Sequence, residues 1–160
     1  MTETLTTALG EAFDRRSWHG TNPRGSIRGL LPEQASWRPG RGHHSVWELV
    51  VHAAYWKYAV RRRLTGEPRG SFPLTGSNFW PRPRTGTAAA WRRDVALLVD
   101  QHRLLVSAVR SVPRARWGRR APGSRFTYAA LVRGATAHDL YHAGQIQLIK
   151  ALARSRGPIR

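Results

Sequence analysis

Residues 135–152, ATAHDLYHAGQIQLIKAL, predict a long helix near the end of the chain. Apolar side chains recur through this stretch at helical spacing, and no proline interrupts it. On an α-helix, positions 138 and 142 lie about 40° apart in projection and about 6 Å apart along the axis, so both rings can face one point. By itself this pair leaves two interpretations open, because His138 and His142 could be metal ligands or two core histidines.

Three other segments share the helical periodicity, and no strand pattern competes with them. The second of them begins at Ser45, where Glu48 stands at capping-box spacing. The predicted helices, including the one that contains the opening stretch, are residues 2–18, 45–65, 87–112 and 127–154.

The connection at residues 66–86 is unusually long and contains several prolines and glycines. A loop of this length inside a compact domain is typically functional or a crossover between elements. Four amphipathic helices with one such connection predict an all-α fold, a four-helix bundle with a long crossover connection. A chain of 160 residues is expected to form one domain, residues 1–160.

The composition excludes several classes of protein. Hydrophobic residues make up 41% and charged residues 22% of the chain, which is typical of a globular protein. There is no cysteine, so disulfides, thiolate catalysis and Cys-ligated zinc are excluded. No apolar run approaches the roughly 20 residues that span a bilayer, and the N-terminus is not a secretory signal. A cytoplasmic protein without a membrane partner is therefore expected.

The net charge of +18 is the unusual feature of the composition. A basic surface attracts nucleic acid through its phosphates, so a basic nucleic-acid-associated or stress-response protein with a structural or absent metal is one hypothesis. However, the only lysines are Lys57 and Lys150, and the arginines are scattered from Arg15 to Arg160. We favour a biased composition, because a binding module more often concentrates its basic residues on one element.

A third histidine, His52, lies midway along the predicted helix 45–65. Leu49, Trp56 and Ala59 share its face, which is expected to point into the core. Three inward histidines are hard to explain as packing, because each neutral imidazole has a donor and an acceptor to satisfy away from water. One shared cation would satisfy all three acceptors. The sequence therefore favours a metal site.

Three polar residues beside these histidines could accept hydrogen bonds from the remaining ring N–H groups: Glu48, Asp139 and Gln145. Glu48 has the capping box as its alternative role. The other histidines stand in or beside loops or in less apolar settings, and they are expected at the surface or at helix caps: His19, His43, His44 and His102.

Three motifs occur in an order that spans nearly the whole chain: WHG at 18–20, LLPEQASWRPGRGHHSVWELVVH at 30–52 and HDLYHAGQI at 138–146. Together they resemble the DinB/YfiT-like metalloprotein superfamily, which are bacterial four-helix bundles with a three-histidine metal site. The most specific parts are the Ser-x-Trp-Glu-Leu start of the second helix and His-x-x-x-His-x-Gly-Gln-Ile on the last.

The resemblance assigns roles to individual residues. It implies His52, His138 and His142 as the metal ligands. It also implies that Gly144 lets the last helix pack closely and that Gln145 packs or bonds near the site. The arginine content and the Pro/Arg-rich loops differ from a typical member, and these loops are expected at the rim of the pocket.

Three neutral histidines leave positions open for water or substrate, the pattern of a catalytic site. Imidazole ligands suit a divalent transition metal, with zinc or nickel as the expected ions. The resemblance implies a small-molecule substrate, a homodimer, and a transferase or isomerase that uses a low-molecular-weight thiol cosubstrate such as bacillithiol or mycothiol. A metal-dependent hydrolase is the alternative, because HDLYH resembles the zincin His-Glu-x-x-His with Asp139 in place of Glu.

Overall fold

The computed structural model of the protein describes residues 1–76 and 78–155, and residues 77 and 156–160 lie outside this description. The described residues form helices and no β-strand, so the fold is all-α as predicted. One isolated antiparallel bridge joins Arg120 to Thr127. The helices are α1 (Thr2–Phe13), α2 (Pro23–Ile27), α3 (Pro32–Ser36), α4 (Val46–Thr65), α5 (Ala88–Ser111), the 3₁₀ helix η1 (Arg114–Arg116) and α6 (Tyr128–Ser155). None of the described helices has the length and apolarity to cross a membrane.

Helices α4, α5 and α6 begin and end close to the expected residues, because their caps are encoded locally. The Ser45 side chain accepts from the backbone N–H of Glu48, and the Glu48 carboxylate accepts from the N–H of Ser45, so the predicted capping box is present. Gly66 ends α4 in the left-handed conformation, with φ of 80°. Thr87 and Thr127 accept from backbone N–H groups three residues on, at the starts of α5 and α6.

The first helix is shorter than predicted, since α1 ends at Phe13 and not at residue 18. The Asn22 amide donates to the carbonyl oxygen of Arg15 at 2.9 Å, which satisfies the backbone just beyond α1 and turns the chain back. The Asn22 Oδ1 atom also accepts from the N–H of Gly25 and caps α2. The connection that precedes α4 therefore contains two short helices, and each of them starts with a proline.

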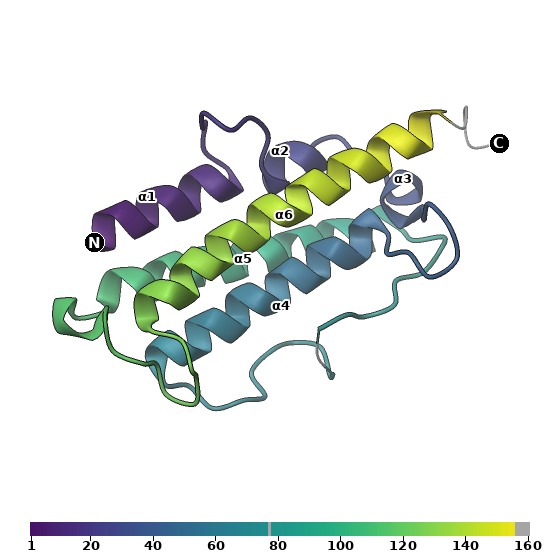
Figure 1. Ribbon diagram of the computed structural model, residues 1–160. Helices are drawn as coiled ribbons and strands as arrows, with labels where there is room; N and C mark the ends of the chain where they lie inside the picture. Colours follow the sequence, from purple (N-terminus) through teal and green to yellow (C-terminus); the bar gives the residue numbers. More distant parts are fainter. Residues whose placement is uncertain (77, 156–160) are drawn as a thin grey trace.

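Figure 1 shows the four long helices, α1, α4, α5 and α6, running side by side. Contacts join α4 to α5 and α6, and α1 to α5 and α6. The connection between α4 and α5 runs back along α4, so α5 follows the same direction as α4, whereas α1 and α6 run the opposite way. Residues of this connection therefore lie beside the α4 side chains.

The long connection is fixed against α4 and α5 by buried polar contacts. The indole Nε1 of Trp47 donates to Asp94 Oδ2 at 2.6 Å, and the Arg82 guanidinium forms an ion pair with the same oxygen at 3.0 Å. A Cβ atom at Gly86 would lie 2.3 Å from the Trp47 ring, so only glycine fits where the connection passes this side chain. The end of the connection is thereby held in one position over the start of α4.

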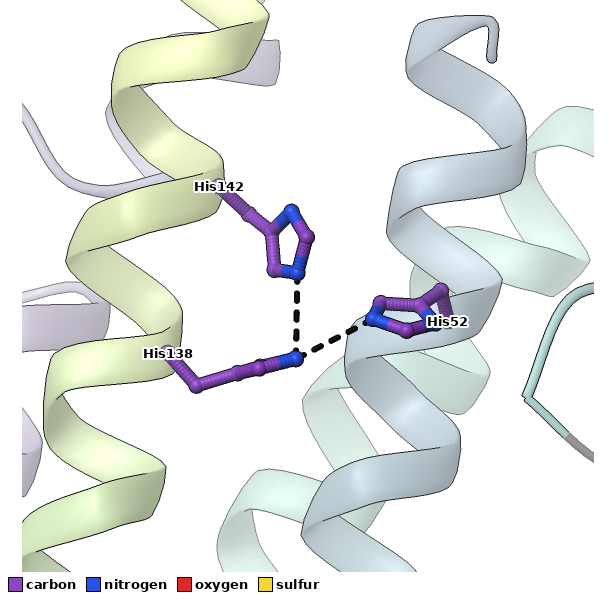
Figure 2. A group of neighbouring side chains, drawn as sticks. All are labelled: His52, His138 and His142. Atoms are coloured by element: carbon purple, nitrogen blue, oxygen red, sulfur yellow. Dashed lines mark hydrogen bonds between the residues drawn. The ribbon is translucent and has the colours of Figure 1, made fainter.

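The core consists of two groups of buried apolar side chains, one at each end of the helices. The first surrounds the start of α4 and includes Phe13, Trp47, Val50, Trp91 and Leu98. The second lies between the other ends of α4, α5 and α6 and includes Leu9, Leu64, Leu105, Val109 and Val132. His52, His138 and His142 come from the middle of α4 and α6 (Figure 2).

Candidate metal centre

Three histidine rings from two helices meet at one point, as Figure 2 shows: His52 from α4, and His138 and His142 from α6. The Nε2 atom of His138 lies 3.1 Å from Nε2 of His52 and 3.0 Å from Nε2 of His142. One nitrogen from each ring lies within 4.8 Å of the others. The i, i+4 spacing on α6 brings its two rings together, and the packing of α4 against α6 adds the third.

The outer nitrogens of two of these rings have defined partners. His52 Nδ1 lies 2.8 Å from the backbone carbonyl oxygen of Asn78, and His142 Nδ1 lies 2.6 Å from Gln145 Oε1. The Gln145 amide nitrogen donates to Tyr141 Oη at 3.0 Å, which is consistent with its Oε1 facing His142. Because a carbonyl oxygen can only accept, both Nδ1 atoms carry the hydrogen.

This assignment leaves a lone pair on Nε2 of both His52 and His142. Both lone pairs point at Nε2 of His138, which has at most one hydrogen and can donate to only one of them. Protein hydrogen bonds therefore cannot satisfy all three nitrogens at once. A cation with nitrogen ligands would satisfy them, so the donor set fits a divalent transition metal.

The surroundings keep the three rings neutral. Burial, together with the neighbouring His142, lowers the pKa of His52 to about 4 and that of His138 to about 3, from an ordinary value of 6.5. Burial also lowers the pKa of His142. Only the neutral imidazole has the lone pair that a metal requires, so the cluster is in its ligand form at neutral pH.

The three polar neighbours expected from the sequence have different positions. Gln145 bonds to His142 as described above. Glu48 instead accepts from Arg38 and from the backbone of Ser45, which is the capping-box role left open by the sequence. Asp139 forms a buried ion pair with Lys57 of α4. Of the three, Gln145 is the residue whose side chain, within the described part of the chain, hydrogen-bonds to a histidine of the cluster.

A pocket of about 520 Å³ opens on the cluster. The ring of Phe79 stacks on His52 with a centroid separation of 4.0 Å. Trp56 was expected in the core, yet it is 37% exposed and lines this pocket, where its Nε1 donates to Asn78 Oδ1. The pocket lining is Leu49, Trp56, Asn78, Phe79, Tyr141, Gln145 and the histidines His44, His52, His138 and His142.

Asn78 and Phe79 were not identified from the sequence. Both lie in the long connection, where no periodicity shows which side chains face the protein. Asn78 adopts a left-handed conformation, with φ of 70°, which asparagine tolerates better than most residues. The signal that could have found it is an asparagine beside an aromatic residue in a loop otherwise rich in proline and glycine.

Of the remaining histidines, His19, His43 and His44 are exposed, as expected. His102 was also expected at the surface, and that prediction is wrong, because its side chain is only 5% exposed. It stacks on Phe13 with a centroid separation of 3.9 Å, and its Nδ1 lies 3.3 Å from the Lys57 ammonium. The polar and charged residues next to His102 in sequence suggested a surface position, although His102 lies on the buried face of α5.

Gly144 also differs from its expected role. A Cβ atom at this position would meet no described atom within 4 Å beyond the adjacent residues and backbone of α6 itself, and the residue is exposed on α6. Within the chain, close helix packing does not require glycine here.

One of three comparisons with known proteins found a relationship. The family profile of the DinB superfamily matches residues 14–146, a span that contains α2 to α5 and all three clustered histidines. Comparison with curated proteins and with solved structures gave no match. Because the family match covers most of the chain, the protein belongs to the DinB superfamily.

Proposed function

We propose that this protein holds a divalent transition metal on His52, His138 and His142. The observation that supports it is that His138 Nε2 lies about 3 Å from Nε2 of both His52 and His142, whose lone pairs are fixed by partners at Nδ1. Neutral imidazole ligands suit several first-row ions, and zinc or nickel is the ion we propose. Asn78 and Gln145 orient the rings through their Nδ1 atoms.

We also infer that the four long helices form one domain, a four-helix bundle with a long crossover connection. Each of α1, α4, α5 and α6 contacts two of the others, which is the pattern of a closed bundle. The ligands then come from the inner faces of two neighbouring helices, as is common for metal sites in bundles.

The reaction we propose is a transfer or isomerisation that uses a small thiol cosubstrate. A bound ion with only three protein ligands supplies an open Lewis-acid position, which favours the thiolate form of a thiol. The chain has no cysteine, so the thiol must come from outside the protein. The pocket over the cluster, about 520 Å³, is large enough for a small organic molecule.

The pocket residues have distinct roles in this proposal. Trp56 and Phe79 form apolar walls that exclude water from the reacting groups. The Tyr141 hydroxyl accepts from the Gln145 amide, which leaves its own hydrogen free to donate to a substrate oxygen. Tyr141 is therefore the side chain we expect to orient the substrate.

The hydrolase alternative has less support. A zincin-like hydrolase needs a carboxylate that acts as general base beside the metal. The residues that line the pocket include no Asp or Glu, and Asp139 forms its ion pair with Lys57. We therefore retain the thiol-dependent reaction as the proposed function.

We propose in addition that the chain forms a homodimer through α6. Tyr141, Leu148 and Leu152 are 63%, 60% and 40% exposed. Their spacing places them within about 40° on one helical face. Gly144 is exposed between them. A face with three large exposed apolar residues favours burial against a second copy, and this contact has to overcome the repulsion that a net charge of +18 places between copies.

Metal content measured by mass spectrometry on protein without a histidine tag tests the central proposal. We expect close to one zinc or nickel ion per chain, lost in His138→Ala while circular dichroism shows the helix content retained. His19→Ala, at an exposed histidine, is the matched control and keeps the ion. If the wild-type protein folds without binding either ion, the proposed site is wrong, and salt-dependent titration with DNA would examine the basic surface instead.

Thiol-dependent chemistry requires a second measurement. Cobalt(II)-substituted protein would develop a sulfur-to-cobalt charge-transfer absorption when a small thiol reaches the ion. The absorption should saturate with thiol and should be lost in His138→Ala. Metal binding with no spectral response to any small thiol would leave the metal site in place and exclude the thiol cosubstrate.

A further inference from the structure

A second pocket, of about 930 Å³, adjoins the metal pocket on the side of the α3–α4 connection. Its walls come from two segments far apart in sequence, residues 33–48 and residues 84–85. The basic side chains that line it are Arg38, Arg41, His43, His44 and Arg84.

The charges of this second pocket do not all cancel. Arg38 is neutralised by Glu48, with its Nη2 atom 2.6 Å from Oε1. Arg41 and Arg84 are exposed, and neither guanidinium forms an ion pair with any residue that the structure describes. Glu33 is the remaining acidic residue of the lining. Two arginines that form no ion pair with any described residue thus line a pocket that has one further carboxylate.

The floor of the second pocket is held by buried hydrogen bonds. Glu48 is 5% exposed, and its Oε2 atom accepts from the backbone N–H of Ser45 at 2.9 Å. The Arg38 ion pair lowers the pKa of Glu48, although burial opposes this effect, so the carboxylate stays charged. The Ser36 hydroxyl donates to the carbonyl oxygen of Arg84 at 2.8 Å, which fixes the position of one basic residue relative to α3.

His44 lies at the junction of the two pockets, because its side chain lines both. Its ring stacks on Phe79 with a centroid separation of 3.7 Å, and Phe79 stacks on His52 at 4.0 Å. The three rings are nearly parallel, with interplanar angles of 1° and 12°. The His44 ring, which lines the second pocket, is therefore two stacking distances from His52 of the metal cluster, a span that a small organic molecule can bridge.

We propose that Arg41 and Arg84 form an oxyanion subsite for the substrate of the metal centre. The ligand is a small organic molecule with a carboxylate or phosphate group at one end. The guanidinium fork matches either oxyanion with two parallel hydrogen bonds. The reactive end passes His44 and lies in the pocket over the three histidines. This inference rests on the proposed function, and it specifies that the substrate of the proposed reaction is an anion.

Thiol probes of graded length test this subsite on the cobalt(II)-substituted protein. One series ends in a carboxylate, one in a phosphate and one in a neutral hydroxyl group, and the charge-transfer absorption gives the dissociation constant of each. At the length that spans the junction, we expect an anionic probe to bind about tenfold more tightly than the neutral probe, as one charge-assisted contact provides. Whichever anion shows the larger advantage identifies the oxyanion.

The double variant Arg41→Gln/Arg84→Gln should lose this advantage and bind the neutral probe as the wild type does. The control variant Arg110→Gln/Arg119→Gln removes the same charge from two exposed arginines outside the pocket. It should keep the preference for the anionic probe. Equal binding of charged and neutral probes, or equal losses in both double variants, would overturn the subsite and leave the thiol-binding metal centre intact. Failure of the protein to bind cobalt would instead overturn the proposed function, and the subsite with it.

Discussion

His52 Nδ1 donates to the backbone carbonyl oxygen of Asn78, 2.8 Å away and 26 residues later in the chain. The long connection thus determines which nitrogen of a helical histidine faces the cluster. The Asn78 side chain strengthens this contact, because its Oδ1 accepts from Trp56 Nε1 at 3.1 Å. Asn78 therefore contacts α4 through both its main chain and its side chain.

Substitution of Asn78 should weaken metal binding even though the side chain is not a proposed ligand. Asn78→Ala removes the bond to Trp56. It also places alanine at a φ of 70°, a conformation that is strained for a residue with a Cβ atom. Asn78→Gly removes the same bond without the strain. We expect zinc affinity to fall about tenfold in Asn78→Ala and less in Asn78→Gly, measured by competition with a chelator. Unchanged affinity in both variants would show that the connection does not orient His52.

Gln145 should matter through its oxygen alone. Gln145→Leu removes the acceptor of His142 Nδ1–H, which is at 2.6 Å, and we expect zinc affinity to fall about tenfold. Gln145→Glu keeps an acceptor oxygen and should bind zinc at least as tightly as the wild type. The same chelator competition measures both variants, and an equal loss in the two would assign Gln145 a packing role instead.

Acid should destabilise the metal-free protein partly through His102. Burial and the adjacent Lys57 ammonium together lower the pKa of this residue from 6.5 to about 3. Between these values the unfolded chain binds a proton that the folded protein excludes, so the free energy of unfolding falls as the pH falls. Near pH 5 we expect a loss of about 2 kcal/mol from this group. Urea unfolding as a function of pH should show a shallower fall in His102→Gln, whereas His19→Gln, at an exposed histidine, should retain the wild-type slope.

The buried ion pair of Lys57 and Asp139 should be costly to break from one side. Both side chains are at most 2% exposed, and Asp139 Oδ1 is buried without a hydrogen bond. Burial raises the pKa of Asp139, and Lys57 opposes that rise. Lys57→Met leaves the carboxyl group unpaired and should lower the free energy of unfolding by about 3–5 kcal/mol.

The double variant Lys57→Met/Asp139→Leu removes both charges and should recover part of that loss in the same urea titration. A double variant no more stable than Lys57→Met would show that the pair contributes through shape and not through charge.

Leu148 provides a test of the proposed dimer. Leu148→Glu puts a carboxylate in the middle of the exposed apolar face of α6 and should give a monomer by sedimentation velocity, with unchanged helix content. Leu104→Glu, at a 44% exposed leucine of α5, is the control and should leave the wild-type mass. If the wild-type protein and both variants sediment as the same species, this face is not an interface between copies.

The long helices could be predicted because their signals are local. Ser45 with Glu48, Thr87, and Gly66 mark helix ends by bonds within a few residues, and the structure has caps at each of them. The end of α1 could not be predicted in this way. It depends on the contact of Asn22 with the Arg15 carbonyl, which forms only after the chain has turned.

In the candidate site, too, the residues that follow a local pattern could be predicted, and those that depend on distant contacts could not. The spacing of His138 and His142 follows from helix geometry, and the inward face of His52 follows from its apolar neighbours. Asn78 could not be foreseen, because its role depends on the path of a connection without periodicity. His102 was misplaced for a related reason, since Lys57, its buried partner, comes from another helix and is 45 residues away in sequence.

The contact between the connection and His52 uses a main-chain oxygen, and every residue type has one. Any sequence that lets the chain pass α4 in this conformation can therefore orient the ring. Residues of the connection that do not contact α4 are then free to change without loss of the ligand geometry, while the Asn78 side chain strengthens the contact. A fold arranged in this way can acquire new substrates by altering its longest loop while its three histidines stay as they are.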